Sequence, residues 1–273
     1  MTDDSSASGQ APPDELNTNM AHAARVWNYF LGGKDHYPAD RVAGDEVLAL
    51  MPEIRESARA DRAFLGRVVR YLAAEAGVRQ FLDIGTGLPT AKNTHEAAQA
   101  VAPESRIVYV DNDPIVLAHA RALLTSGPAG VTAYVDADVR DTDKLLQAAA
   151  QTLDFSQPVA LMLLGILNFV VDDDEAHAIV NRLLDAVPSD SYLAVVHPTQ
   201  EVVGEAMAEV LRRWKERGGA PMVDRSPQEL ARFFDRLELL EPGVVPCTQW
   251  RPDPGDPSSQ VEVPHFCAVG RKP

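Results

Sequence analysis

The chain is 273 residues long, with 45% hydrophobic and 24% charged residues, a composition ordinary for a globular protein that folds in water. It holds 25 basic and 40 acidic residues, which gives a formal net charge of -15. A surface this acidic repels phosphate backbones and anionic lipids, so we expect neither nucleic-acid binding nor membrane association.

Cysteine usage and the first residues both favour a cytoplasmic protein. The two cysteines, Cys247 and Cys267, show no metal-ligand spacing, so we expect buried, reduced thiols and no metal site. The opening residues are acidic and polar, which is not typical of a signal peptide. The longest apolar run, from Val159 to Val171, is too short to span a bilayer.

The N-terminal part of the chain is expected to be helical. Residues 1–13 are mostly Ser, Asp, Ala, Gly and Pro, which predicts a disordered tail. A helix carrying Val26, Trp27 and Phe30 on one face follows and ends at Gly32-Gly33. Two further helices are predicted over 39–50 and 62–76, so residues 14–77 form a helical segment.

From residue 78 onward, short apolar runs alternate with helical patterns, which is typical of a parallel sheet. A capping box at Ser226-Pro227-Gln228-Glu229 opens a late helix. The last two strands have no helix between them and should pair as an antiparallel hairpin. The predicted strands are 81–84, 107–111, 131–135, 159–164, 191–196, 244–248 and 261–269, and the helices between the first six are 93–101, 114–125, 143–153, 173–187 and 201–217. Residues 78–273 are therefore predicted to be one α/β domain with a mostly parallel, seven-stranded sheet.

Three acids lie at or just beyond the ends of consecutive predicted strands and should meet at one sheet edge. The first strand leads from Asp83 into a turn containing Gly85 and Gly87, where backbone amides can approach a ligand. Asp111 ends the second strand, where a carboxylate suits ribose hydroxyls, and Asp138 follows the third, where it can accept from an adenine amino group. The third glycine of a dinucleotide fingerprint is absent. The pattern predicts an adenosine pocket without a phosphate site, the alternative being that these acids are ordinary caps and turn residues.

These residues and the terminal hairpin resemble the class I S-adenosylmethionine-dependent methyltransferases, which have a Rossmann-like fold. The run from Arg25 to Asp40 (RVWNYFLGGKDHYPAD) is more specific. Together with 108–114 and 241–245 it resembles the actinobacterial S-adenosyl methyltransferase family first described as a domain of unknown function. The resemblance extends from about Asn17 to the end of the chain. Pro89 stands where the superfamily pattern often has a third glycine.

The resemblance implies S-adenosyl-L-methionine as cofactor, with S-adenosyl-L-homocysteine as its product. It implies that Gly85 and Gly87 approach the methionine end, that Asp111 holds the ribose, and that Gly165 lies near the sulfonium. Asp138 and Val139 are implied at the adenine. The complete set of cofactor-binding candidates is Asn28, Lys34, Asp35, Asp83, Gly85, Thr86, Gly87, His95, Asp111, Asn112, Asp138, Val139 and Gly165.

Methyl transfer from a sulfonium is an in-line displacement that needs alignment, a dry site and in some cases a base, but no metal. The catalytic candidates are His197, His36 and Tyr37. His197 follows the fifth strand, and its alternative role is a strand-end histidine bonded to backbone. The loop from Lys34 to Tyr37 can close over the cofactor or serve only as a capped turn. Similarly, Asn93 and His95 either bind the cofactor carboxylate or cap their helix.

We therefore expect a cytoplasmic methyltransferase acting on a small-molecule acceptor, with a helical N-terminal segment that helps to cover the cofactor. Nucleic-acid and membrane partners are not expected, and a homo-oligomer is left open. One alternative is a non-catalytic S-adenosylmethionine-binding or regulatory module. Another is a nicotinamide-dependent oxidoreductase, since Asp111 also suits the ribose of that cofactor.

Overall fold

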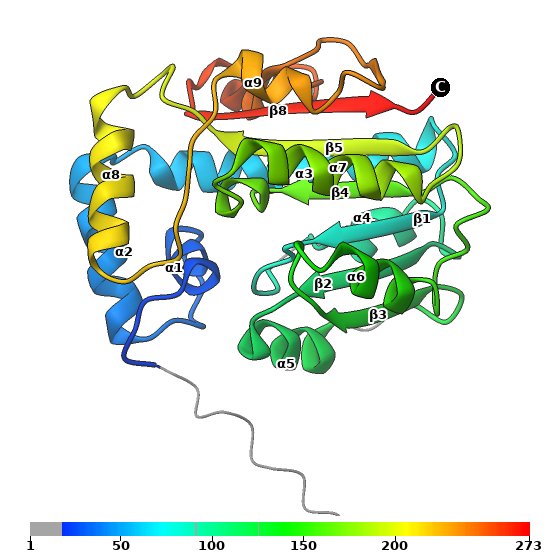
Figure 1. Ribbon diagram of the computed structural model, residues 1–273, viewed down its shortest axis with the longest axis horizontal. Helices are drawn as coiled ribbons and strands as arrows, with labels where there is room; N and C mark the ends of the chain where they lie inside the picture. The colour runs from blue at the N-terminus through cyan, green and yellow to red at the C-terminus, as the bar shows by residue number, and fades with distance from the viewer. Residues whose placement is uncertain (1–17, 91, 125) are drawn as a thin grey trace, which may run out of the picture.

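The computed structural model describes residues 18–90, 92–124 and 126–273 (Figure 1). The tail expected over residues 1–13 lies outside these ranges. The first described elements are the helices α1 (Ala23–Phe30), α2 (Pro38–Leu50) and α3 (Ile54–Ala74). α3 begins at Ile54 rather than at the predicted Arg62, because after Ile54 its first turns bury only Ser57, Ala58 and Ala60, small residues that give little hydrophobic signal. No helix of the described ranges is both long enough and apolar enough to cross a bilayer.

A mostly parallel sheet forms the centre of the molecule. Its strands are β1 (Gln80–Ile84), β2 (Arg106–Asp111), β3 (Val131–Asp136), β4 (Ala160–Leu164), β5 (Tyr192–Pro198), β6 (Glu238–Leu239), β7 (Val245–Pro246) and β8 (His265–Arg271). The order is β3-β2-β1-β4-β5-β8-β6, with β7 paired to β8. β1 to β5 are parallel, and β8 runs antiparallel to β5. The predicted Rossmann-like sheet with an antiparallel end is confirmed.

Both faces of the sheet are covered by helices, because its central strands are apolar on both sides. Neighbouring residues of β1 illustrate this: Phe81 faces one core and Leu82 the other, and neither is exposed to solvent. The first core includes α3, α4 (Thr94–Gln99) and α5 (Pro114–Leu123). The second includes α6 (Thr142–Ala149), α7 (Asp173–Asp185) and α9 (Pro227–Arg232).

The last strands differ from the prediction in their bounds. Residues 244–248 contribute only the short β7, followed by a 3-10 turn at Cys247–Gln249, and β8 starts at His265 rather than at Val261. Pro246 and Pro264 explain both limits, because a proline has no backbone N–H to donate to a strand ladder. The short β6 was not predicted. Among the described residues, the sheet therefore has eight strands instead of seven.

A smaller core joins the N-terminal helices to α8 (Glu205–Glu216). Val26 and Phe30 of α1 pack there with Met207, Val210 and Trp214 of α8. We call α1, α2, α8 and the start of α3 the helical lobe. In Figure 1 the arrowheads of the parallel strands point toward α1, α2 and α8. The lobe therefore stands at the edge where parallel sheets bind ligands, and it is built from two distant parts of the chain.

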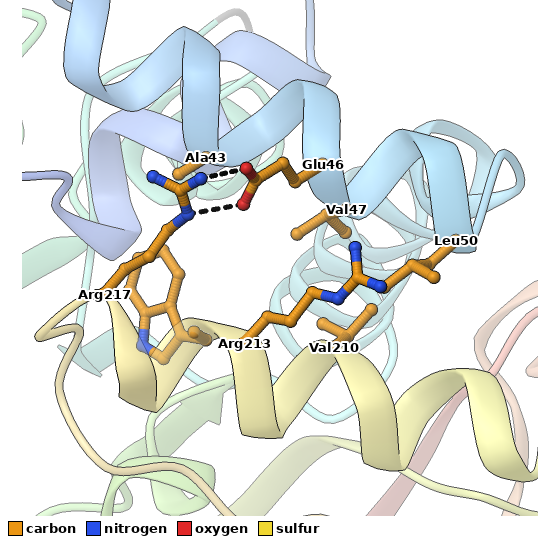
Figure 2. Close-up of a pocket in the computed structure, with 8 residues that line it drawn as sticks. Ala43, Glu46, Val47, Leu50, Val210, Arg213 and Arg217 are labelled. Atoms are coloured by element: carbon orange, nitrogen blue, oxygen red, sulfur yellow. Dashed lines mark hydrogen bonds and ion pairs between the residues drawn. The ribbon is translucent and has the colours of Figure 1, made fainter.

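Figure 2 shows a small pocket between α2 and α8. Val47 and Val210 line it, and an ion pair between Glu46 and Arg217 lies at one end. Its volume of about 10 Å³ is enough for one water molecule at most. None of its lining residues belongs to the glycine turn or to the end of a strand, so this pocket is a gap in helix packing within the lobe.

Candidate functional site

The turn after β1 depends on two glycines with different roles. Gly85 has a φ of 76° and Gly87 a φ of 65°, a region that residues with a Cβ rarely adopt. A Cβ on Gly85 would come within 2.7 Å of the Ile166 side chain, whereas one on Gly87 would meet nothing within 4 Å. Thr86 closes the turn, its hydroxyl donating to the Asp83 carbonyl at 3.1 Å. Packing requires Gly85, while Gly87 leaves open space beside the backbone.

A second open glycine follows β4, the neighbour of β1 in the sheet. Gly165 has a φ of 82°, and a Cβ built on it would meet nothing within 4 Å. Its amide donates to the Val196 carbonyl at 3.1 Å, which fixes this turn to β5. Gly87 and Gly165 together leave bare backbone at the carboxyl ends of two adjacent strands, which forms a cradle for a ligand.

Asp111 lies at the end of β2, beside this cradle. One carboxylate oxygen accepts from the Gly87 amide at 2.9 Å and the other from the Asp113 amide at 3.0 Å. Burial raises the pKa of Asp111, and these two backbone hydrogen bonds partly offset that effect. The carboxylate thus fixes the glycine turn to the turn that starts α5. Each of its oxygens has further acceptor capacity for a ligand hydroxyl.

The ends of β2 and β3 are linked by side chains. Asn112 donates its amide N–H to Asp138 at 3.0 Å, and the same carboxylate accepts from the backbone of Arg140 at 2.9 Å. Asp138 is half-buried and Val139, which follows it, is buried. The structure therefore brings Asn112, Asp138 and Val139 together next to Asp111.

Asp83 and His95 point into the protein interior. The Thr94 hydroxyl donates to the buried Asp83 carboxylate at 2.6 Å. Burial raises the pKa of Asp83 to about 6, against the lowering effects of that hydrogen bond and of the Arg62 charge. His95 contacts the Tyr109 hydroxyl through its ring nitrogen Nδ1 at 2.9 Å. Asn93 forms a capping box at the start of α4. These contacts hold α4 against β1 and β2.

The loop between α1 and α2 is organised by Asn28. Its side-chain oxygen accepts from the Asp35 amide at 3.1 Å, and it packs so closely on Gly33 that a Cβ there would clash. His36 contacts the Gly33 carbonyl through Nε2 at 3.1 Å. Lys34 and Asp35 are exposed. The loop thus presents these two charged side chains to solvent from a fixed backbone.

The same loop is fastened to the glycine turn. Ala24 and Tyr37 pack on a cluster formed by Leu88, of the glycine turn, with Ile115 and Val116 of α5. The Nδ1 atom of His22 lies 3.0 Å from the Asp113 carboxylate, and a buried ion pair of 3.0 Å joins Arg25 to Asp40. The helical lobe therefore contacts the segments that carry Gly87 and Asp111.

His197 is enclosed at the end of β5. Its Nδ1–H donates to the Pro198 carbonyl at 2.9 Å, and its Nε2 accepts from the Arg225 guanidinium at 2.9 Å. The side chain is completely buried, and burial is the main reason that its pKa falls to about 4. Arg225 also donates to the carbonyls of Leu167 and Val170. Both ring nitrogens are thus engaged in a buried network that holds the turn after β4.

One arrangement at this edge has no counterpart in the sequence analysis. His265, the first residue of β8, pairs in register with Pro198 of β5. Its Nδ1 atom lies 2.7 Å from the carboxylate of Asp61 on α3. The Trp27 ring is stacked on the imidazole, with 5.4 Å between the ring centroids. Asp61 and His265 are 204 positions apart, so no local pattern could have joined them.

The site fits an adenosine-type cofactor with no phosphate. The open backbone at Gly87 and Gly165 provides room, Asp111 offers acceptors for ribose hydroxyls, and Asp138 and Val139 follow the next strand. A group of three or more metal-ligating side chains is not found within the described residues. The carboxylates of Asp111 and Asp113 beside the glycine turn suit a cationic cofactor.

Comparisons with known proteins show the family of the chain. The family model described as S-adenosyl methyltransferase matches residues 9–273. A DUF574 family protein from Streptomyces avermitilis is 47% identical, with 95% of this chain and 100% of that one covered and a TM-score of 0.91. A candidate methyltransferase from Thermobifida fusca is 39% identical, with coverages of 96% and 98% and a TM-score of 0.87.

A more distant match shows the shared fold. The plantazolicin methyltransferase BpumL, solved with S-adenosylhomocysteine, is 8% identical, with coverages of 92% and 95% and a TM-score of 0.52. Comparison with curated proteins gave no match. The family model covers nearly the whole chain and two solved structures agree with it in both sequence and fold. The chain belongs to the S-adenosyl methyltransferase family.

Proposed function

We propose that the protein transfers the methyl group of S-adenosylmethionine to a small-molecule acceptor at the edge where β1, β2 and β4 end. The observation that carries the proposal is the cradle at Gly87 and Gly165 with the Asp111 carboxylate beside it. The family match supports the cofactor. When bound, this cofactor supplies an electrophilic methyl group, so the chain's own residues need to align the partners and exclude water.

The residues proposed to face the cofactor divide into four groups. Asp111 is proposed to accept from the ribose hydroxyls, and Gly85, Thr86 and Gly87 to approach the methionine end. Gly165 is proposed to lie near the sulfonium. Asn112, Asp138 and Val139 are proposed to surround the adenine, which their position beyond β2 and β3 supports.

The helical lobe is proposed to close over the bound cofactor. Lys34 and Asp35 are exposed on a loop whose backbone is fixed by Asn28. They are proposed to reach the cofactor when it is present. Asp83 and His95 are proposed to act indirectly, because their contacts with Thr94 and Tyr109 hold α4 and thereby the glycine turn.

The catalytic candidates are proposed to have unequal roles. His197 has no exposed ring nitrogen and a pKa lowered to about 4 by burial, so we assign it to positioning the turn after β4. His36 contacts a loop carbonyl, and Tyr37 packs on the glycine turn. Both are assigned to closing the lobe over the cofactor and excluding water.

Calorimetry tests the cofactor assignment. We expect S-adenosylhomocysteine to bind and NAD not to bind. Asp111→Ala should weaken binding about 10- to 100-fold, the loss expected for hydrogen bonds to a charged group. Asp136→Ala removes an exposed acid at the end of β3 and is the matched control. Equal affinity in both variants would remove Asp111 from the site.

The acceptor class is tested with methyl-labelled S-adenosylmethionine and a Streptomyces avermitilis extract, chosen because a close relative comes from that organism. The extract is separated by size into small molecules and macromolecules before incubation. Label that appears with the small molecules supports the proposal. Label found only with macromolecules would overturn the small-molecule assignment while leaving methyl transfer intact.

A further inference from the structure

His265 lies at the edge of the sheet that carries the candidate site. As the register partner of Pro198, it lies at the same edge as the carboxyl ends of the parallel strands. α1 connects it to the cofactor side, since Ala24 packs on the glycine-turn cluster and Trp27 stacks on the imidazole. These two residues are three positions apart on one helix, which separates them by only about 4.5 Å along its axis.

The ring of His265 is held in one orientation. A carboxylate accepts hydrogen bonds and cannot donate them, so the contact of 2.7 Å with Asp61 places the ring proton on Nδ1. Trp27 covers one face of the ring with an interplanar angle of 1°. Nε2 is therefore left with its lone pair, and no hydrogen-bond or ion-pair partner for it is found among the described residues. The charged and titratable groups around the pair are Arg62, His197 and the buried thiol of Cys247.

Asp61 is suited to stabilise a charged imidazole. Its second carboxylate oxygen is buried and has no hydrogen-bond partner within the described ranges. The side chains of Asp61 and His265 are 13% and 9% exposed, so their contact is shielded from water. A base whose second ring nitrogen is oriented by a carboxylate is the arrangement used in nucleophile activation and general-base catalysis.

We propose that His265, positioned by Asp61, is the general base that deprotonates a hydroxyl group of the acceptor. This inference rests on the proposed methyl transfer and adds the acceptor class, an alcohol or phenol. The hydroxyl proton passes to Nε2 while an oxygen–carbon bond forms and the carbon–sulfur bond breaks, its electron pair staying on sulfur. The sulfonium charge is thereby replaced by an imidazolium beside Asp61. His197, with both nitrogens engaged, cannot take this proton.

The geometry of the reaction sets a distance that can be tested. A reacting oxygen about 3 Å from the methyl carbon and a base about 3 Å from that oxygen place Nε2 roughly 8 Å from the sulfonium. A positive charge at that distance lowers the pKa of a histidine by about 0.5 to 1.5, depending on the effective dielectric. S-adenosylhomocysteine has no such charge.

Nitrogen-15 NMR of the histidine rings in the full-length protein measures this effect. In the free protein we expect His265 to carry its proton on Nδ1. Its pKa should be lower by about 0.5 to 1.5 in the S-adenosylmethionine complex than in the S-adenosylhomocysteine complex. His177, which packs on Phe233 in the helix layer, is the internal control and should not distinguish the two ligands. Equal pKa values of His265 in both complexes, or a proton on Nε2, would overturn the proposal.

Two variants complete the test. Asp61→Ala removes the acceptor for Nδ1–H, so it should abolish the fixed Nδ1 tautomer, and it also assigns the resonances. His265→Gln should keep its affinity for S-adenosylhomocysteine within about twofold, because a base for the acceptor does not hold the product. A loss above tenfold would make His265 a cofactor-binding residue instead. If the wild-type protein binds neither S-adenosylmethionine nor S-adenosylhomocysteine, the proposed function fails. If it binds both and the pKa of His265 is the same in the two complexes, only this inference fails. The comparison of the two complexes of the wild-type protein does not depend on whether His265→Gln folds.

Discussion

Asp83→Asn is expected to stabilise the ligand-free protein at neutral and alkaline pH. The carboxyl is buried, and burial raises its pKa from 3.8 to about 6. Each pKa unit corresponds to about 1.4 kcal/mol, so keeping this carboxylate charged costs the folded state about 3 kcal/mol above pH 6. Asparagine removes the charge, and its side-chain oxygen can still accept from the Thr94 hydroxyl.

The stabilisation expected for Asp83→Asn depends on pH. Between about pH 4 and pH 6 the unfolded chain has released the proton of Asp83 while the folded protein retains it. The contribution of Asp83 to the free energy of unfolding therefore falls as the pH rises through this window. Asp83→Asn should exceed wild type by about 2 to 3 kcal/mol at pH 8 and match it near pH 4.

Urea unfolding of the ligand-free proteins at pH 8 and pH 4 measures both values. Asp136→Asn, which changes an exposed acid at the end of β3, should differ from wild type by less than about 0.5 kcal/mol at either pH. If Asp83→Asn were no more stable than wild type at pH 8, the Arg62 charge would compensate the carboxylate fully, and the reasoning from burial would be wrong.

Two further perturbations address the buried network and the lobe. Arg225→Met should lower the free energy of unfolding by about 3 kcal/mol, because it leaves His197 and two buried carbonyls without their donor, and thermal unfolding measures this loss. An unchanged melting temperature would contradict the assigned positioning role. Tyr37→Ala removes a packing contact with the glycine-turn cluster and should speed dissociation of S-adenosylhomocysteine several-fold in stopped-flow measurements. Dissociation at the wild-type rate would leave Tyr37 with a packing role only.

The parallel part of the fold was predictable because its signals are local. Apolar runs such as 107–110, which ends at Asp111, can be identified residue by residue, and β1 to β5 appear where those runs predict them. The C-terminal strands were less predictable. Pro246 and Pro264 limit β7 and β8 through missing backbone donors, and the two-residue β6 is too short to produce a periodic pattern.

The site was predictable where it follows strand ends, and unpredictable where distant segments meet. Asp111 lies beside the glycine turn as the strand order requires. The sequence could not indicate that Asp83 faces Thr94, since that direction depends on how α4 packs. It also gave no sign of the contact between Asp61 and His265, because a pair 204 positions apart shares no periodic pattern.

The helical lobe limits how this protein can be recombined with its relatives. Its core takes Val26 and Phe30 from the start of the chain and Met207 and Trp214 from a helix almost two hundred residues later. A chimera that exchanges only residues 18–77 would join helices from two proteins across that core. Exchanging the N-terminal segment together with 203–219 keeps each core with its own partners. The lobe should therefore be exchanged between family members by moving these two segments as a pair.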